Sequence, residues 1–142
     1  MPTVPLTRTT VGPLDLDAAD ALAVLPLLGS LAAGLLLWPE LPAEMAVHFS
    51  GGRADSYMSR SVAVWLVPVI GLAAVAYTRR KTPYAGLFRT VYLGFVGWVV
   101  AGAHLYVLAW NLGYQVTSLV VAVPAAGGAV ALVALRKTGV AR

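Results

Sequence analysis

The chain has 142 residues, of which 59% are hydrophobic and only 11% are charged, and its formal net charge is +4. An ordinary soluble domain carries about 25% charged residues, and a domain this small cannot hide so much apolar surface from water. The composition therefore excludes a soluble enzyme and a disordered chain. Because there is no cysteine, disulfides and thiolate metal sites are excluded as well.

Four apolar runs follow one another along the chain, at residues 21–38, 61–77, 91–110 and 116–135. At about 1.5 Å per helical residue, each run can cross all or most of a hydrocarbon core of roughly 30 Å. None of the runs contains Asp, Glu, Lys or Arg. Since a spanning helix satisfies its own backbone hydrogen bonds, we predict an all-α integral membrane protein built as a bundle of four transmembrane helices.

The start of the chain differs in character from the rest. Residues 1–13 contain three prolines and several threonines, which predicts a mobile cytoplasmic tail, and residues 14–142 form a single membrane domain. Asp15 or Asp17 is expected to cap the first helix, because a carboxylate accepts hydrogen bonds from free backbone N–H groups at that end.

Lysine and arginine are divided unevenly between the two sides of such a bundle. Eight of the ten fall on the side that holds both termini, and the loop between the first two spans carries only Arg53 and Arg60. Positively charged loops stay in the cytoplasm, so we expect a multi-pass plasma-membrane protein with cytoplasmic N- and C-termini. We interpret the cluster at residues 79–81 as a stop-transfer anchor, and we expect no nucleic-acid partner.

Two features inside the spans bear on function. His104 is the one His within a span, and an ionisable residue at this depth is a candidate functional group. The alternative is a neutral imidazole hydrogen-bonded to Ser30, Thr117 or a backbone carbonyl. Small residues four apart, such as Gly97 and Ala101, predict close helix contacts, either within the bundle or in a homo-oligomer.

The external loop, residues 39–60, is 22 residues long, and loops of this length are usually functional or disordered. Met45, Val47 and Phe49 alternate with less apolar residues, which predicts a short strand. Residues 50–53 then read as a turn because paired glycines permit positive φ, and residues 54–57 are expected to return as the second strand of a small β-hairpin.

The same loop resembles a small membrane domain of unknown function that forms the N-terminal part of the SdpI family of bacterial toxin-immunity proteins. The resemblance covers about residues 21–77 and lies in Leu-Pro, His-aromatic, Gly, Asp and Ser-Arg positions: Leu41, Pro42, His48, Phe49, Gly52, Asp55, Ser59 and Arg60. It implies two transmembrane helices joined by a signature loop. Residues 78–142 show no match to the second membrane region of the immunity proteins.

Three interpretations of the loop side chains remain open. His48, Phe49, Gly52, Asp55, Tyr57 and Arg60 could together recognise an external peptide or lipid ligand. Alternatively, Asp55 has a structural role, accepting turn N–H groups or pairing with Arg53 or Arg60, while His48 packs as a polar contact. In the third, Glu44, His48 and Asp55 supply oxygen and nitrogen ligands to a divalent metal, although their spacing matches no established metal motif.

Our leading hypothesis for function is non-enzymatic. The loop has no nucleophile motif, phosphate-binding loop or carboxylate pair, so no catalytic residues and no cofactor are expected. The resemblance instead implies that the outer loop recognises, or protects against, a membrane-active external agent. The alternative is a small transporter or a subunit of a larger membrane complex.

Overall fold

The computed structural model describes residues 17–81 and 86–138. The tail expected at residues 1–13, and Asp15 as a helix cap, lie outside these residues. The described chain forms four α-helices, one 3-10 turn and one pair of strands: α1 (Ala18–Leu36), η1 (Trp38–Glu40), β1 (Glu44–Ser50), β2 (Arg53–Ser59), α2 (Arg60–Lys81), α3 (Gly86–Asn111) and α4 (Leu119–Lys137).

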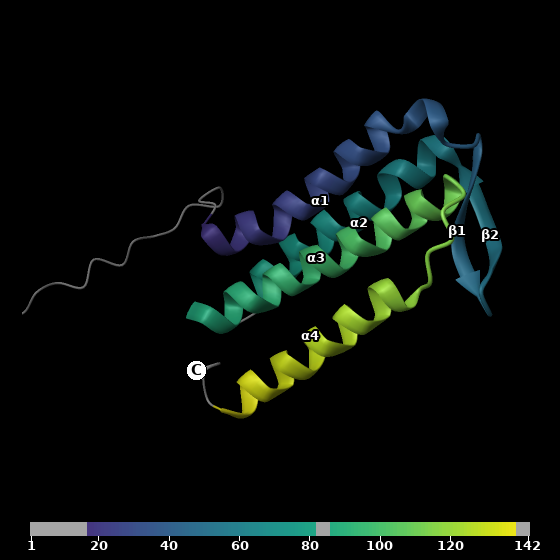
Figure 1. Cartoon of the computed structure of the whole chain (residues 1–142). Coiled ribbons are helices and arrows are strands. Elements are labelled where there is room, and N and C mark those ends of the chain that lie inside the picture. The colour runs from purple at the N-terminus through teal and green to yellow at the C-terminus, as the bar shows by residue number, and fades with distance from the viewer. Residues whose placement is uncertain (1–16, 82–85, 139–142) are drawn as a thin grey trace, which may run out of the picture.

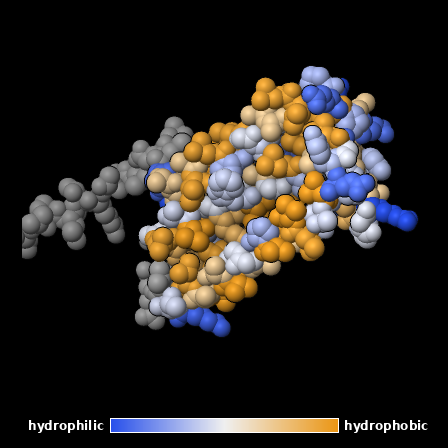
Figure 2. Space-filling model, viewed as in Figure 1, coloured by the Kyte–Doolittle hydropathy of each residue, from blue (hydrophilic) through white to orange (hydrophobic). Residues whose placement is uncertain are grey.

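All four helices run along one direction of the molecule, with the hairpin across one end (Figure 1). By length and composition, each of the four is long and apolar enough to cross a membrane. Figure 2 shows apolar side chains along the middle of the molecule and hydrophilic ones gathered toward its ends. The expectation of a mostly helical protein, with four helices long and apolar enough to span a membrane and one small two-stranded sheet, is confirmed. We call the two ends the hairpin end and the opposite end.

Two helices are several residues longer than the spans predicted from the apolar runs, because polar residues extend them beyond the apolar segment. α2 runs past residue 77 to Lys81, and α3 begins at Gly86 rather than at residue 91. Hydropathy detects only the part of a helix that fits hydrocarbon, whereas the backbone hydrogen bonds continue, and cations favour the C-terminal turn of α2. In contrast, α4 begins at Leu119 rather than at residue 116, after a turn in which Gly113 has a φ of 87°.

The hairpin forms where it was expected. β1 and β2 are antiparallel, and Gly51 (φ 55°) and Gly52 (φ 76°) make the turn between them. The register shifts on both sides of His48, so Val47 and Asp55 have no direct partner across the ladder. Ala46, between Met45 and Val47 on β1, is only 3% exposed, and its backbone N–H donates a hydrogen bond to Asn111 of α3.

The three helices α1, α2 and α3 form a compact bundle around buried apolar residues that include Leu27, Val75 and Leu93. The closest approach joins α1 to α3. A Cβ added at Gly97 would lie 2.0 Å from the carbonyl oxygen of Ala23, so the two backbones touch at this glycine. Among the described elements, α4 contacts α3 alone.

The contact at Gly97 generates a stability prediction. Gly97→Ala forces α1 and α3 apart, and overpacking of this kind typically costs about 1–3 kcal/mol, more than the roughly 1 kcal/mol that alanine gains over glycine in a helix. We therefore expect a lower melting temperature in detergent. Gly29→Ala is the matched control, since its added Cβ meets nothing within 4 Å and should not lower the melting temperature. Equal melting temperatures for both variants would contradict the close approach.

Candidate functional site

The candidate site is the β-hairpin, which is fixed to the bundle at the last residue of α3. The side chain of Asn111 donates a hydrogen bond from Nδ2 to the carbonyl oxygen of Ala46 and accepts one at Oδ1 from the Ala46 N–H, each 2.8 Å long. A primary amide has the same donor and acceptor as a peptide unit, so Asn111 pairs with β1 as a residue of a third strand would. The Asn111 Nδ2 also donates to the carbonyl oxygen of Val107 at 2.8 Å, which holds the side chain in place.

Arg60 makes a second attachment at the start of α2. Its Nη1 donates to the carbonyl oxygens of Trp38 and Leu41, each at 2.8 Å, and its guanidinium carbon lies 5.0 Å from the centre of the Trp38 ring. Trp38 begins η1, where its carbonyl also accepts from the Leu41 N–H, and the Leu41 carbonyl lies directly after η1, so Arg60 joins the start of α2 to the segment that follows α1. Arg60 therefore closes the base of the loop. Neither Arg60 nor Arg53 forms the expected pair with Asp55.

Phe49 makes a third attachment, through aromatic contacts with α3. Its ring meets that of Tyr106 at a centroid distance of 5.3 Å and that of Trp110 at 4.9 Å, both edge-on. Aromatic pairs in this geometry contribute about 0.5–1.5 kcal/mol beyond the area they bury. Phe49, like Arg60, thus faces the bundle and supports the hairpin rather than the surface that an external molecule would meet.

The exposed side of the hairpin carries a polar network centred on Asp55. The Oδ1 atom of Asp55 lies 2.6 Å from Nδ1 of His48, and its Oδ2 accepts a hydrogen bond of 2.6 Å from the Ser50 hydroxyl. The side chains of His48 and Asp55 are 71% and 40% exposed. The hydrogen bonds from Ser50 and from His48 hold the pKa of Asp55 below its ordinary value, so the carboxylate stays charged into the acid range.

This arrangement favours binding over hydrolysis. In a Ser-His-Asp triad the hydroxyl donates to the imidazole, whereas Ser50 donates to the carboxylate. With the Nδ1 proton of His48 directed at Asp55, the other ring nitrogen is left to interact with a molecule outside the protein. Tyr57, 60% exposed on β2, adds an aromatic surface, and Gly52 lies at the turn.

The structure separates the residues of the hypothetical metal site. Glu44 lies opposite Ser59 at the base of the hairpin, while His48 and Asp55 lie nearer its turn. Within residues 17–81 and 86–138, no three His, Asp or Glu side chains are grouped so that they could hold a metal ion. His48 and Asp55 are therefore brought together without a third ligand of these types.

His104 lies in the interior of the bundle, fully buried against the backbone of Gly34. The alternative interpretation, an imidazole hydrogen-bonded to Ser30, Thr117 or a backbone carbonyl, is wrong for the described residues. The Ser30 hydroxyl donates to the carbonyl oxygen of Leu27 in its own helix, and neither ring nitrogen of His104 has a hydrogen-bond partner among the described residues. A serine in a helix readily bonds back to the preceding turn, so it is not free to meet a neighbour.

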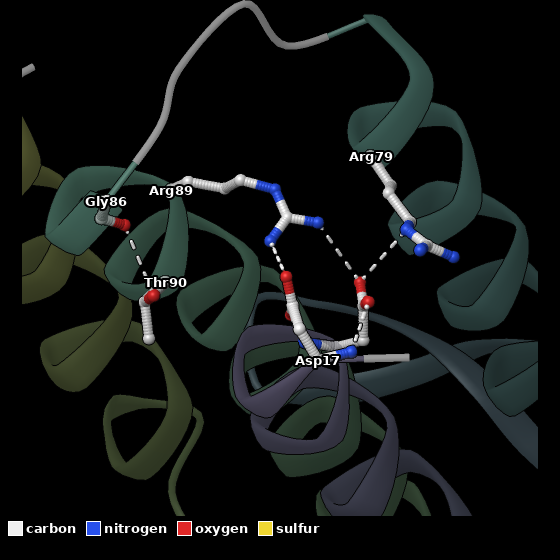
Figure 3. A network of polar contacts seen from close by, with 6 residues as sticks. Asp17, Arg79, Gly86, Arg89 and Thr90 are labelled. Atoms are coloured by element: carbon white, nitrogen blue, oxygen red, sulfur yellow. Dashed lines mark hydrogen bonds and ion pairs between the residues drawn. The ribbon is translucent and has the colours of Figure 1, made fainter. Parts of the chain in front are cut away.

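A second polar cluster, at the opposite end, was missed by the sequence analysis. Arg89 of α3 donates to Asp17 at 2.6 Å and lies 3.4 Å from Asp20, while Nε of Arg79 in α2 lies 3.3 Å from Asp20 (Figure 3). Asp20 is only 2% exposed. The backbone N–H of Asp20 and the Arg89 guanidinium hold the pKa of Asp17 below its ordinary value. The cluster joins α1, α2 and α3.

Sequence signals for these missed groups exist but are weak. Asp17 and Asp20 have the three-residue spacing of a capping box, which the structure confirms, and Asp17 is the helix cap. Asn111 follows directly after an apolar run of 20 residues, and this position predicts only that it belongs to the linker between two spans. Only the folded hairpin shows that its amide has a strand to bind.

The fold defines the class of the protein as a membrane protein with four apolar helices and an ordered hairpin between the first two. A family model described as a domain of unknown function, DUF1648, matches residues 25–72, which extend from α1 through the hairpin into α2. The match supports a domain of unknown function over these residues, and the link to toxin-immunity proteins stays a prediction. Neither the curated proteins nor the solved structures give a match.

The Asn111 contacts predict a local effect. Asn111→Ala leaves the N–H and carbonyl of buried Ala46 without partners, and an unsatisfied buried polar group costs about 1–3 kcal/mol. We expect faster hydrogen–deuterium exchange at residues 44–50 in nanodiscs, with little change in the middle of α1 and α2. Ser56→Ala, on the exposed part of β2, is the control and should exchange like the wild type. Unchanged exchange in Asn111→Ala would show that the hairpin is held by other contacts.

Proposed function

We propose that this protein lies in the plasma membrane with both termini in the cytoplasm and the hairpin outside. The charge distribution supports this orientation. Of the described cations, six lie at the opposite end (Arg79, Arg80, Lys81, Arg89, Arg136 and Lys137), and Arg53 and Arg60 lie at the hairpin end. Cytoplasmic loops carry an excess of Lys and Arg.

In this orientation the hairpin recognises a membrane-active agent that approaches from outside, and it protects the cell or reports envelope stress. The main observation that supports this function is the network of His48, Asp55 and Ser50. It is exposed on a hairpin that three separate contacts attach to the bundle. A preorganised polar group loses little conformational freedom on binding, which favours affinity. The resemblance to toxin-immunity proteins supports the same function.

The residues proposed for recognition fall into two groups. His48, Asp55 and Tyr57 are exposed and can contact a peptide or a lipid headgroup directly. Phe49 and Arg60 act indirectly, because their side chains fix the hairpin on the bundle, and Gly52 provides the turn. Recognition thus depends on a small exposed surface and a larger buried support.

A survival experiment tests this proposal. A deletion strain of the source organism is complemented with wild type, His48→Ala, Asp55→Ala or Ser56→Ala at matched membrane levels, and exposed to secreted peptides and other membrane-active agents. We expect wild type and Ser56→Ala to protect, and His48→Ala and Asp55→Ala to protect only at doses about tenfold lower, the change expected for losing roughly 1.4 kcal/mol of recognition.

The controls separate recognition from folding. Melting temperatures of the purified variants should be close to that of the wild type, because both altered side chains are exposed. Equal protection by all four proteins would overturn the proposed role of the network. Loss of protection together with a low melting temperature would assign the residues to stability instead.

One observation favours a second candidate, a subunit of a larger membrane complex. Only 6% of the residues in the apolar segment of α4 are buried within the chain, so most of the surface of this helix is available to other molecules. Co-purification of a stoichiometric partner that is lost when α4 is replaced by a polyleucine helix would support this candidate.

A further inference from the structure

The contact between α3 and α4 is tight at one place and open at another. A Cβ added at Gly128 would lie 2.4 Å from the ring of Phe95, so the two helices touch there. Toward the hairpin end they enclose a groove of about 460 Å³. Small residues on both helices, including Gly102 and Ala125, leave this space, and larger apolar side chains such as Trp98 and Leu105 form its walls.

A second cavity, of about 650 Å³, lies at the hairpin end of the same seam. The two cavities share Tyr106 and Val116, so they adjoin each other. Hydroxyl, amide and indole groups gather in the second cavity, whose lining includes Trp110, Tyr114, Gln115, Thr117 and Ser118, and the turn residue Gly52 of the hairpin reaches its edge. The described lining of both cavities contains no Asp, Glu, Lys or Arg.

We propose that this seam binds one phospholipid molecule, with an acyl chain in the groove between α3 and α4 and the phosphate group in the polar cavity beneath the hairpin turn. The order of the two cavities matches the order of the chemical groups in the lipid. Each volume lies within the range of roughly 300–1,000 Å³ that is usual for small-molecule sites. The proposal does not depend on the proposed recognition of an external agent.

Contacts in the polar cavity are what would favour a lipid bound at the seam over a lipid free in the surrounding bilayer. Within hydrocarbon there is no hydrophobic driving force, so an acyl chain gains only packing by entering the groove. Preference for one lipid must therefore come from its head. Phosphate oxygens only accept hydrogen bonds, and Tyr114, Thr117 and Ser118 supply hydroxyl donors at that level.

Photo-crosslinking tests the proposal in the full-length protein. The protein is placed in nanodiscs of phosphatidylethanolamine containing phosphatidylglycerol with a diazirine in one acyl chain, and the labelled peptides are identified by mass spectrometry. We expect label to concentrate on the groove segments of α3 and α4, above the level on the exposed face of α1. Gly102→Leu and Ala125→Leu fill the groove from opposite helices, and each should reduce this label about fivefold.

Matched controls make each outcome decisive. Gly29→Leu, on an open face of α1, should leave the groove label unchanged. A diacylglycerol with the same diazirine chain lacks the phosphate and should label at least fivefold less, about the change expected for losing a single one of the hydrogen bonds to the phosphate. Even labelling of all exposed helices, insensitivity to both groove variants, or equal labelling by diacylglycerol would overturn the proposal. Crosslinks between two protein copies through the groove would also overturn it, by assigning the groove to a second copy.

Discussion

The pairing of Asn111 with Ala46 is the interaction on which the hairpin end of this protein depends. An isolated two-stranded hairpin is only marginally stable in water, and this one has only two strands. The Asn111 amide supplies the hydrogen bonds that a third strand would provide, and it belongs to the last residue of a 26-residue helix. Arg60 then closes the base of the loop, and Phe49 packs the end of β1 against α3. With these contacts the polar network of His48, Asp55 and Ser50 has a defined position above the bundle.

The sequence was most informative where a pattern has a single physical solution. Four long runs without charges predict four helices, and paired glycines at Gly51 and Gly52 predict the turn, because only such residues adopt positive φ without strain. His48 and Asp55 were both among the candidate site residues. Their direct contact, however, follows from the register shifts of the hairpin, which no local pattern indicates.

The remaining differences between expectation and structure share a cause, which is that a side chain has several possible partners in the sequence and the fold determines which of them it contacts. Arg60 was expected at the recognition surface, but the carbonyls of Trp38 and Leu41 bind its guanidinium. Ser30 was a candidate partner for His104, but it bonds to its own helix. Arg79 was interpreted as part of a stop-transfer anchor, and it also lies beside the buried carboxylate of Asp20. A sequence gives the chemical groups, while their pairing is a tertiary property.

The two ends of the molecule therefore have different tasks. At the opposite end, Asp17 and Asp20 with Arg79 and Arg89 join three helices through charge. At the hairpin end, the Asn111 amide, the Arg60 guanidinium and aromatic contacts hold an exposed surface in place. Helix α4 does not belong to either group of contacts, since among the described elements it contacts α3 alone and leaves an amphipathic seam beside the hairpin.

The central claim, that the hairpin is presented outside the cell, is tested most directly by cysteine accessibility. The chain has no native cysteine, so single substitutions report without background. Ser56→Cys on the hairpin and Thr138→Cys after α4 are treated in intact cells with a membrane-impermeant maleimide. Our account predicts rapid labelling at position 56 and labelling at position 138 only after the membrane is permeabilised. Labelling of position 138 but not position 56 in intact cells would contradict it.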